Sequence, residues 1–153
     1  MIPAVGSGYD SHRFAEGRPL ILGGVRIEHE RGLDGHSDAD AVAHALTDAV
    51  LGAAGLGDIG THFPPSDDRW RDADSLELLR TAVAMVPGRV LNADVTVICE
   101  EPKLGPHREQ MQRNLYDVVG APVSVKATTN EGMGWIGAGE GIACIAVALL
   151  DLE

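Results

Sequence analysis

Apolar residues gather along this chain in short runs and in helical stripes, and the two patterns predict a mixed fold of strands and helices. Runs rich in β-branched residues indicate strands over residues 2–8, 91–100, 123–128 and 141–150. Residues 20–22 and 25–27 are also predicted to be extended, with a glycine pair between them that permits a bulge or turn. The run 141–150 is almost wholly apolar, so we expect a central strand covered on both faces.

Three other stretches have the periodicity and the end signals of amphipathic helices, and they cover residues 39–54, 74–85 and 106–119. The first follows Ser37-x-x-Asp40, which resembles a capping box. Glycines and prolines make residues 57–72 a loop, and its length is typical of a mobile flap over a substrate.

The order of these elements predicts the architecture. A strand over 91–100, a helix and a strand over 123–128 follow one another closely, which implies a right-handed crossover with the two strands parallel. The chain has 153 residues, of which 44% are hydrophobic, so it is long enough for one core and too short for two comfortable ones. We therefore expect a single catalytic domain over residues 1–153, of the α+β class, with a mixed β-sheet packed against helices.

The charge balance limits the choice of partners. Lysine and arginine total 12 against 23 aspartate and glutamate, which gives 12 − 23 = −11. This excess of negative charge argues against broad electrostatic binding of nucleic acid or of an anionic membrane. Only 4% of the residues are aromatic, too few for a surface that stacks bases. An anionic substrate would have to be held by local groups.

The cysteines and the apolar runs indicate a compartment. Cys99 and Cys144 each lie inside an apolar run, as buried free thiols do in a reducing environment. The chain opens with no basic segment followed by an apolar one, and no apolar run reaches the roughly 18 residues that cross a bilayer. These features predict a cytoplasmic protein without a membrane partner.

One carboxylate and two imidazoles suggest a metal site. Asp10 and His12 are expected just after the first strand, in an accessible loop, and His44 on the first helix. Two nitrogens and one oxygen could bind zinc as three protein ligands and leave the fourth tetrahedral position for water or substrate. Asp48, one helical turn beyond His44, would orient its imidazole through a hydrogen bond. The alternative is that all four are ordinary turn and helix residues.

Two further segments have polar groups suited to anions. At the end of a predicted strand, Lys126 and Thr129 can donate to phosphate oxygens and Glu131 is a hard oxygen ligand suited to Mg²⁺. Residues 101–106 precede a helix, so free backbone amides there can meet an anion or a base edge. Each segment is equally consistent with an ordinary turn or connector. No motif for covalent catalysis is present.

Several segments, in this order, together resemble the family of 2-C-methyl-D-erythritol 2,4-cyclodiphosphate synthases, and the resemblance spans nearly the whole chain. They are Asp10-Ser11-His12, His36-Ser37-Asp38-Ala39-Asp40, His44-Ala45-Leu46-Thr47-Asp48, Gly57-Asp58-Ile59-Gly60, Pro102-Lys103, Lys126-Ala127-Thr128-Thr129-x-Glu131 and Gly139-Glu140-Gly141-Ile142-Ala143-Cys144.

The resemblance implies a phosphorus–oxygen lyase of the non-mevalonate isoprenoid pathway. Its reaction converts 4-diphosphocytidyl-2-C-methyl-D-erythritol 2-phosphate to 2-C-methyl-D-erythritol 2,4-cyclodiphosphate and CMP, by metal-assisted attack of the 2-phosphate on the β-phosphate. It also implies a homotrimer with active sites at the subunit interfaces. A phosphate monoester is mostly a dianion at neutral pH, so the lack of a covalent nucleophile in this chain agrees with that chemistry.

Carried onto this chain, the resemblance implies one Zn²⁺ per subunit on Asp10, His12 and His44, and a Mg²⁺ or Mn²⁺ ion on Glu131. His36 and Thr129 would stabilise the transition state. The substrate contacts that it implies are Ser37, Asp58, Ile59, Gly60, Phe63, Asp67, Pro102, Lys103, Leu104, Gly105, Ala127, Thr128 and Trp135.

The chain departs from the family pattern at three positions. Ala138 stands where many members carry an arginine thought to hold an anionic isoprenoid on the trimer axis. Pro65 replaces a carboxylate found in some members, and Trp135 replaces a frequent phenylalanine. Two other hypotheses remain open at this stage: a zinc hydrolase that uses the same three ligands to activate water, and a non-catalytic trimer with a structural zinc of closed coordination.

Overall fold

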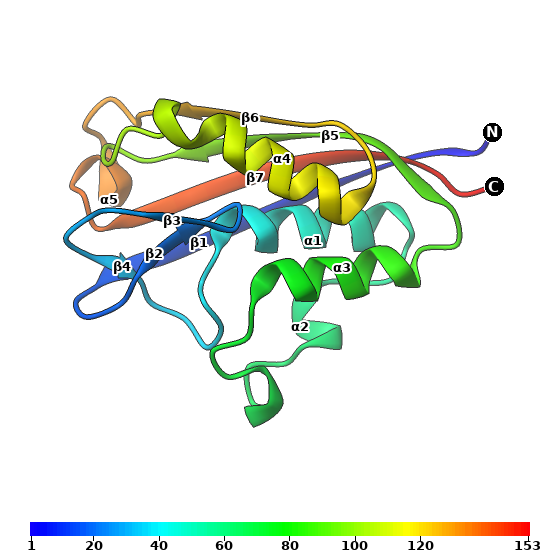
Figure 1. The fold of residues 1–153 in the computed structure, drawn as a ribbon, viewed down its shortest axis with the longest axis horizontal. Helices are drawn as coiled ribbons and strands as arrows, with labels where there is room; N and C mark the ends of the chain where they lie inside the picture. The colour runs from blue at the N-terminus through cyan, green and yellow to red at the C-terminus, as the bar shows by residue number, and fades with distance from the viewer.

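The computed structural model describes residues 1–153 as a five-stranded sheet with the three longer helices on one side (Figure 1). The strands are β1 (Pro3–Ala15), β2 (Leu20–Leu22), β3 (Val25–Ile27), β4 (Gly32–Leu33), β5 (Arg89–Ile98), β6 (Val123–Thr128) and β7 (Gly141–Asp151). The helices are α1 (Ala41–Ala53), α2 (Ile59–His62), α3 (Ser75–Met85), α4 (Arg108–Val119) and α5 (Gly134–Gly137), with 3₁₀ turns η1 (Asp68–Trp70) and η2 (Gly105–His107).

The sheet is mixed, with strand order β4-β1-β7-β5-β6. β1 and β5 both pair antiparallel with β7, whereas β5 and β6 run parallel and are connected through α4. This confirms the α+β class and the parallel pair that the sequence predicted. β2 and β3 form a separate two-stranded ribbon. None of the helices is long and apolar enough to cross a bilayer.

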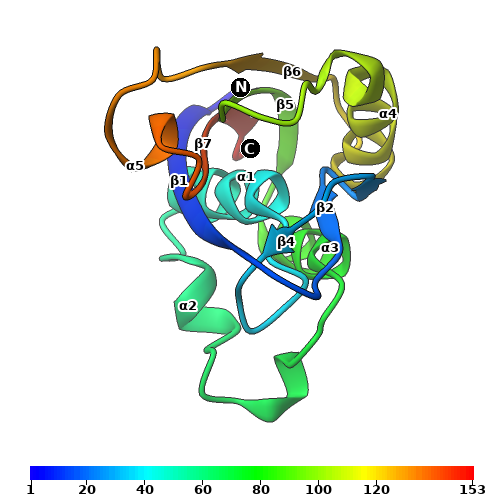
Figure 2. The same ribbon diagram turned by 90° about the vertical axis from the view of Figure 1, so that its left-hand side faces the viewer.

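Helix α1 lies at the centre of the molecule, between the sheet and α3 (Figure 2). Two glycines of β1 let it approach closely. A Cβ atom on Gly8 would lie 1.9 Å from the carbonyl oxygen of Ala45, and one on Gly6 would lie 2.0 Å from that of Ala49. Because side chains larger than hydrogen cannot fit there, the backbone of α1 rests directly on β1. This contact brings His44 over the strand.

Two boundary predictions are wrong. The first strand does not end at residue 8 but continues to Ala15, so Asp10 and His12 lie inside β1 and not in a loop after it. Helix α1 begins at Ala41, and Asp40 is its N-cap residue, since its side chain accepts a hydrogen bond from the backbone N–H of Ala43. The capping box was therefore placed three residues too early. The loop 57–72 also contains the short helices α2 and η1.

The last strand, β7, is central as predicted, but only one of its faces is covered. Its residues alternate between buried and exposed, and the exposed ones are apolar, as are their neighbours on β1. Val5 is 69% exposed, Tyr9 56% and Ile145 44%, with Val147 and Leu149 beside them. We call these five residues the bare face. Soluble monomers rarely leave so contiguous an apolar surface open to water.

The two ends of the chain lie together at one end of the sheet (Figure 1). Pro3 pairs with Asp151, and the N–H of Leu152 donates to the carbonyl oxygen of Ile2 at 2.9 Å. Cys99 and Cys144 are both buried free thiols, as expected from their apolar surroundings, and burial raises the pKa of the Cys99 thiol to about 11.

Candidate active site

Asp10, His12 and His44 meet between β1 and α1. Asp10 and His12 are two residues apart on a strand, so both side chains lie on the face that α1 covers. The Nε2 atom of His12 lies 2.6 Å from Asp10 Oδ2, and His44 Nδ1 lies 3.2 Å from the same oxygen. The two ring nitrogens are 3.4 Å apart. Three possible metal ligands thus converge, with one atom of each within 4.8 Å of the others.

The outward nitrogens of both imidazoles are hydrogen-bonded to the protein. His12 Nδ1 donates to the carbonyl oxygen of Asp34 at 2.7 Å, and its Nε2 faces Asp10, to which it donates when protonated and where a metal could replace that proton. His44 Nε2 lies 2.8 Å from Ser75 Oγ and 3.0 Å from Ser37 Oγ. Metal-binding histidines are usually held in this way, with the second nitrogen fixed by a protein group. The donor set therefore fits a divalent cation such as zinc.

The electrostatics of the cluster agree with its geometry. Burial favours the neutral form of Asp10, but the hydrogen bonds from His12 and His44 outweigh it and lower the pKa of the carboxyl group. Burial also works to lower the pKa of His12, but the hydrogen bond to Asp10 and its negative charge outweigh it and raise that pKa. Without a metal, the carboxylate stays ionised and the His12 ring holds its proton more tightly than a free imidazole.

A cavity of about 170 Å³ opens beside the two imidazoles. Five of the predicted site residues line it together with His12 and His44, namely His36, Ser37, Ile59, Gly60 and Phe63. The sequence reasoning did not identify Trp70 and Leu78 as further lining residues, because they look like ordinary apolar residues of a loop and a helix. Trp70 packs edge-on against Phe63 with ring centroids 5.0 Å apart. The predicted flap thus forms one wall of the cavity.

The flap is attached to the segment that precedes α1. His36 Nε2 donates to the carbonyl oxygen of Asp67 at 3.0 Å, and the backbone N–H of Asp72 donates to the carbonyl oxygen of His36 at 2.8 Å. The Asp67 carboxylate is paired with Arg69 at 2.7 Å. Asp58 is the N-cap residue of α2 and accepts hydrogen bonds from Thr61. Both carboxylates thus have hydrogen-bond partners within the flap.

The remaining predicted residues lie in a second cluster that does not line this cavity. Pro102, Lys103, Leu104 and Gly105 follow β5, whereas Ala127, Thr128, Thr129 and Glu131 end β6 and begin the next loop. The N–H of Cys99 donates to the carbonyl oxygen of Thr128 at 3.0 Å, so the two segments lie side by side. Most of these residues are exposed, but the side chain of Leu104 is buried in the core.

Glu100 holds the loop that contains Glu131. Its Oε2 atom accepts a hydrogen bond from the N–H of Asn130 at 2.6 Å, and its Oε1 atom accepts one from the N–H of Gly132 at 3.2 Å. Glu131 between them has a left-handed backbone, with φ of 55°. Such a conformation is costly for a residue with a side chain, so the surrounding contacts must maintain it. The sequence alone did not single out Glu100.

One predicted role is corrected by the contacts, and one predicted anion-binding residue has a partner within the chain. Asp48 does not orient His44, because its Oδ1 atom accepts a hydrogen bond from the backbone N–H of Ile59 at 2.7 Å, and serines bind the imidazole instead. Lys126 on β6 is paired with the carboxylate of Asp94 on β5 at 2.5 Å. Both side chains are about half exposed, so the amino group of Lys126 remains accessible at the surface.

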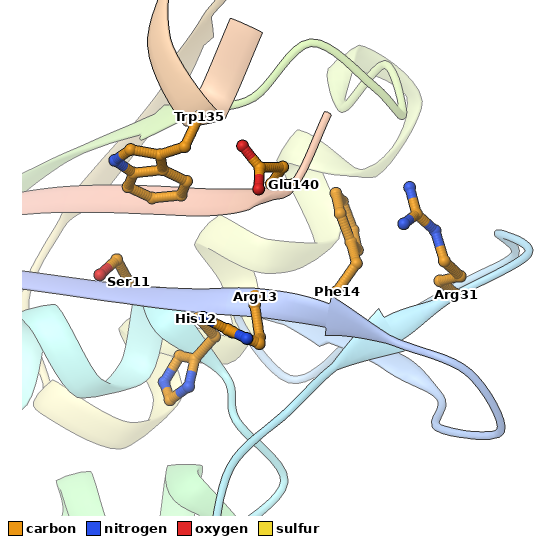
Figure 3. A pocket seen from close by; sticks show the side chains of 7 residues that line it. All are labelled: Ser11, His12, Arg13, Phe14, Arg31, Trp135 and Glu140. Carbon is orange, nitrogen blue, oxygen red and sulfur yellow. The ribbon is translucent and has the colours of Figure 1, made fainter. Parts of the chain in front are cut away.

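The largest hollow of the molecule, about 570 Å³, lies on the opposite side of β1. It is lined by Ser11, Arg13, Trp135 and Glu140 among others, and Figure 3 shows Ser11 and His12 on opposite sides of the strand. Trp135 therefore belongs to the side of the sheet that carries the bare face and not to the cavity beside the imidazoles. His12 also borders this hollow, although its side chain lies on the other side of the strand from that of Ser11.

The sequence pattern of the YgbB family matches residues 4–151, which include both clusters and the whole sheet. The chain belongs to the YgbB family. This YgbB chain is 56% identical to the 2-C-methyl-D-erythritol 2,4-cyclodiphosphate synthase of Symbiobacterium thermophilum, over 95% of this chain and 97% of the relative. It is 53% identical to the bifunctional enzyme IspD/IspF of Rhodospirillum rubrum, over 97% of this chain but only 40% of that longer protein.

A solved structure of 2C-methyl-D-erythritol-2,4-cyclodiphosphate synthase in a CDP-bound form has the same fold. Its TM-score with this YgbB chain is 0.87 at 42% identity, and the match covers 96% of this chain and 99% of that one. Together with the relatives, this confirms the family resemblance that the short motifs of the sequence indicated.

Proposed function

We propose that this chain converts 4-diphosphocytidyl-2-C-methyl-D-erythritol 2-phosphate to 2-C-methyl-D-erythritol 2,4-cyclodiphosphate and CMP. The observation that carries the proposal is the convergence of Asp10, His12 and His44 beside the cavity, with both outward ring nitrogens hydrogen-bonded. Relatives with that activity in their names match nearly the full length of the chain.

Asp10, His12 and His44 would hold one Zn²⁺ per subunit, and Glu131 would hold a Mg²⁺ or Mn²⁺ ion. Two such ions would offset the repulsion among the phosphates of the substrate, which is the main obstacle in a chain with a net charge of −11. The rest of the chemistry falls to the side chains and to the backbone.

The reaction forms a bond between an oxygen of the 2-phosphate and the β-phosphorus, and it breaks the bond from that phosphorus to the oxygen of CMP. The attacking phosphate is mostly a dianion at neutral pH, so no protein group has to remove a proton from it. The protein has to position the two phosphates in line and stabilise the charge of the leaving group. His36 and the hydroxyl of Thr129 are the donors that we assign to this stabilisation.

Substrate binding is divided between the two clusters. Ser37, Ile59, Gly60 and Phe63 enclose the cavity beside the imidazoles, which suits the short methylerythritol part. The exposed ends of β5 and β6, around Lys103 and Thr128, suit the cytidine diphosphate part. Within one chain the second cluster does not line this cavity.

We further propose a homotrimer in which the second cluster of one subunit completes the first cluster of its neighbour. The bare face supports this assembly, because Val5, Tyr9 and Ile145 would lose their contact with water against another copy. A closed ring of three identical interfaces would cover the same face on every subunit.

The decisive experiment supplies the purified chain with the cytidine substrate, zinc and Mg²⁺, and follows the phosphorus NMR spectrum. A cyclic diphosphate and CMP are expected in equal amounts. Release of open-chain methylerythritol phosphates would support a zinc hydrolase instead. A matched pair of variants separates metal binding from folding: His44→Ala should lose zinc and turnover, while His29→Asn, which changes a histidine packed against Phe14, should keep both.

A further inference from the structure

We propose that Ser75, held by Asp38, is a positioning residue for His44. It fixes the tautomer of the imidazole so that the lone pair of Nδ1 is available to the metal site. This inference deepens the proposed function and rests on the proposed metal site. Ser75 is the first residue of α3 and is fully buried, and it reaches the outward nitrogen of His44 across the junction between α1 and α3.

The argument starts from the carboxylate of Asp38, which is surrounded by donors. Its Oδ2 atom accepts a hydrogen bond from the backbone N–H of Ser75 at 3.0 Å, and its Oδ1 atom accepts one from the N–H of Asp40 at 3.0 Å. The hydroxyl of Ser75 also donates to Oδ1. An ionised carboxylate only accepts hydrogen bonds, so Asp38 takes the single hydroxyl proton of Ser75.

The direction of the next hydrogen bond follows from that assignment. Ser75 has one O–H group, and it already points to Asp38. Its oxygen can therefore only accept from His44 Nε2, which lies 2.8 Å away. The proposal therefore places the proton of the neutral imidazole on Nε2 and the lone pair on Nδ1, against the carboxylate of Asp10, which lies 3.2 Å from Nδ1 and competes for the same proton when no metal is bound. That nitrogen faces Asp10 and His12, where a metal ligand is needed.

Ser37 supports this arrangement without determining it. Its oxygen lies 3.0 Å from His44 Nε2 and accepts a hydrogen bond from the N–H of Ala39 at 3.2 Å. No carboxylate fixes its hydroxyl, which lies within 3.4 Å of Ser75 Oγ and is free to donate there or elsewhere. On the outward side of the ring, only the Asp38–Ser75 pair specifies the direction of the hydrogen bond to His44.

The sequence separation explains why the pair is easily overlooked. Asp38 and Ser75 are 37 residues apart and flank α1 and the flap. A serine after Asp74 looks like a helix start, and Asp74 is indeed the N-cap residue of α3. The hydroxyl of Ser75 is therefore not needed for capping and remains available for His44.

The test uses the full chain with and without zinc. In the metal-free protein labelled with ¹⁵N at histidine, long-range proton–nitrogen spectra should assign His44 to the Nε2–H tautomer. The Ser75→Ala variant should have a mixture of tautomers, and its zinc affinity, measured against a chelating dye, should fall about 10- to 100-fold. Thr81→Ala is the matched control, because it removes an exposed hydroxyl from the same helix and should change neither quantity.

An Nδ1–H tautomer in the wild-type chain would overturn the inference, even if the variant fails to fold. So would a Ser75→Ala variant that keeps both the wild-type tautomer and the wild-type zinc affinity. Absence of zinc binding in the wild type would refute the proposed metal site instead, while the tautomer could still be read from the metal-free protein. The two failures are thus distinguishable.

Discussion

At the scale of single residues, protons and metal compete for the same atoms. Asp10 and His12 lie 2.6 Å apart without a metal, and their mutual attraction lowers the pKa of the carboxyl group and raises that of the imidazole. A zinc ion that binds to His12 must first displace the proton that Asp10 helps to retain. Asp10 thus stabilises both the protonated form of His12 and a bound zinc ion.

Zinc affinity should therefore weaken as the pH falls. Because the pKa of His12 lies above its usual value of about 6.5, the loss should begin near neutral pH and reach about tenfold per pH unit for each proton displaced. Dye-competition titrations between about pH 6 and about pH 8 would measure this. A zinc affinity that stays constant over this range would contradict the assignment of His12 as a ligand.

The candidate ligands could be proposed from the sequence together with the family resemblance, but the groups that support them could not. A carboxylate and an imidazole two residues apart are uncommon enough to suggest a metal, whatever the local backbone is. Ser75 and Asp34 have no such signal, because a serine hydroxyl or a backbone carbonyl occurs everywhere in a sequence. For Asp48, helical spacing placed a carboxylate near His44 but could not show that its oxygen points to Ile59.

At the scale of elements, the contact between α1 and β1 positions the site. Gly8→Ala would force a Cβ atom to within 1.9 Å of a backbone oxygen, so the free energy of unfolding should fall by about 3 kcal/mol or more. In Gly52→Ala, on helix α1, the added Cβ atom meets nothing closer than 3.9 Å, and the free energy of unfolding should rise by up to about 1 kcal/mol. Chemical denaturation would measure both. Equal effects would show that the close approach is unimportant.

The loop after β6 depends on the two hydrogen bonds from Glu100. In Glu100→Gln, the amide nitrogen cannot accept, so one of these bonds is lost. One such hydrogen bond stabilises the loop by about 1.5 kcal/mol, so its loss should speed hydrogen exchange at Asn130 or Gly132 about tenfold. The exposed neighbour offers a control, since Glu101→Gln should leave exchange unchanged. Unaltered exchange in both variants would mean that the loop is held by other contacts.

Element boundaries were harder to predict than element types. The polar run Asp10-Ser11-His12-Arg13 reads as a loop, yet pairing with β7 extends β1 through it, with Asp10 opposite Cys144 and His12 opposite Ile142. Such pairing is a long-range interaction that local propensity does not contain. The helices were better predicted because their period and their end signals are local.

At the scale of the whole molecule, the bare face is an apolar surface that a single chain leaves exposed to water. The sequence predicted β7 as covered on both faces, but within one subunit only one face is covered. Ile145→Lys places a charge on this face and should convert the proposed trimer to folded, inactive monomers, as measured by light scattering and turnover. Tyr116→Lys, an exposed apolar position on α4, should leave the assembly intact. Active monomers would refute the shared site.

Both chain ends leave the sheet side by side, at the start of β1, and Asp10 lies about 20 Å or more further along that strand. A second polypeptide joined to either end would therefore extend away from the metal ligands, and the tether would not cross the cavity. A polypeptide fused to either end is thus compatible with this fold. The longer Rhodospirillum rubrum relative, of which this chain covers 40%, is consistent with that freedom.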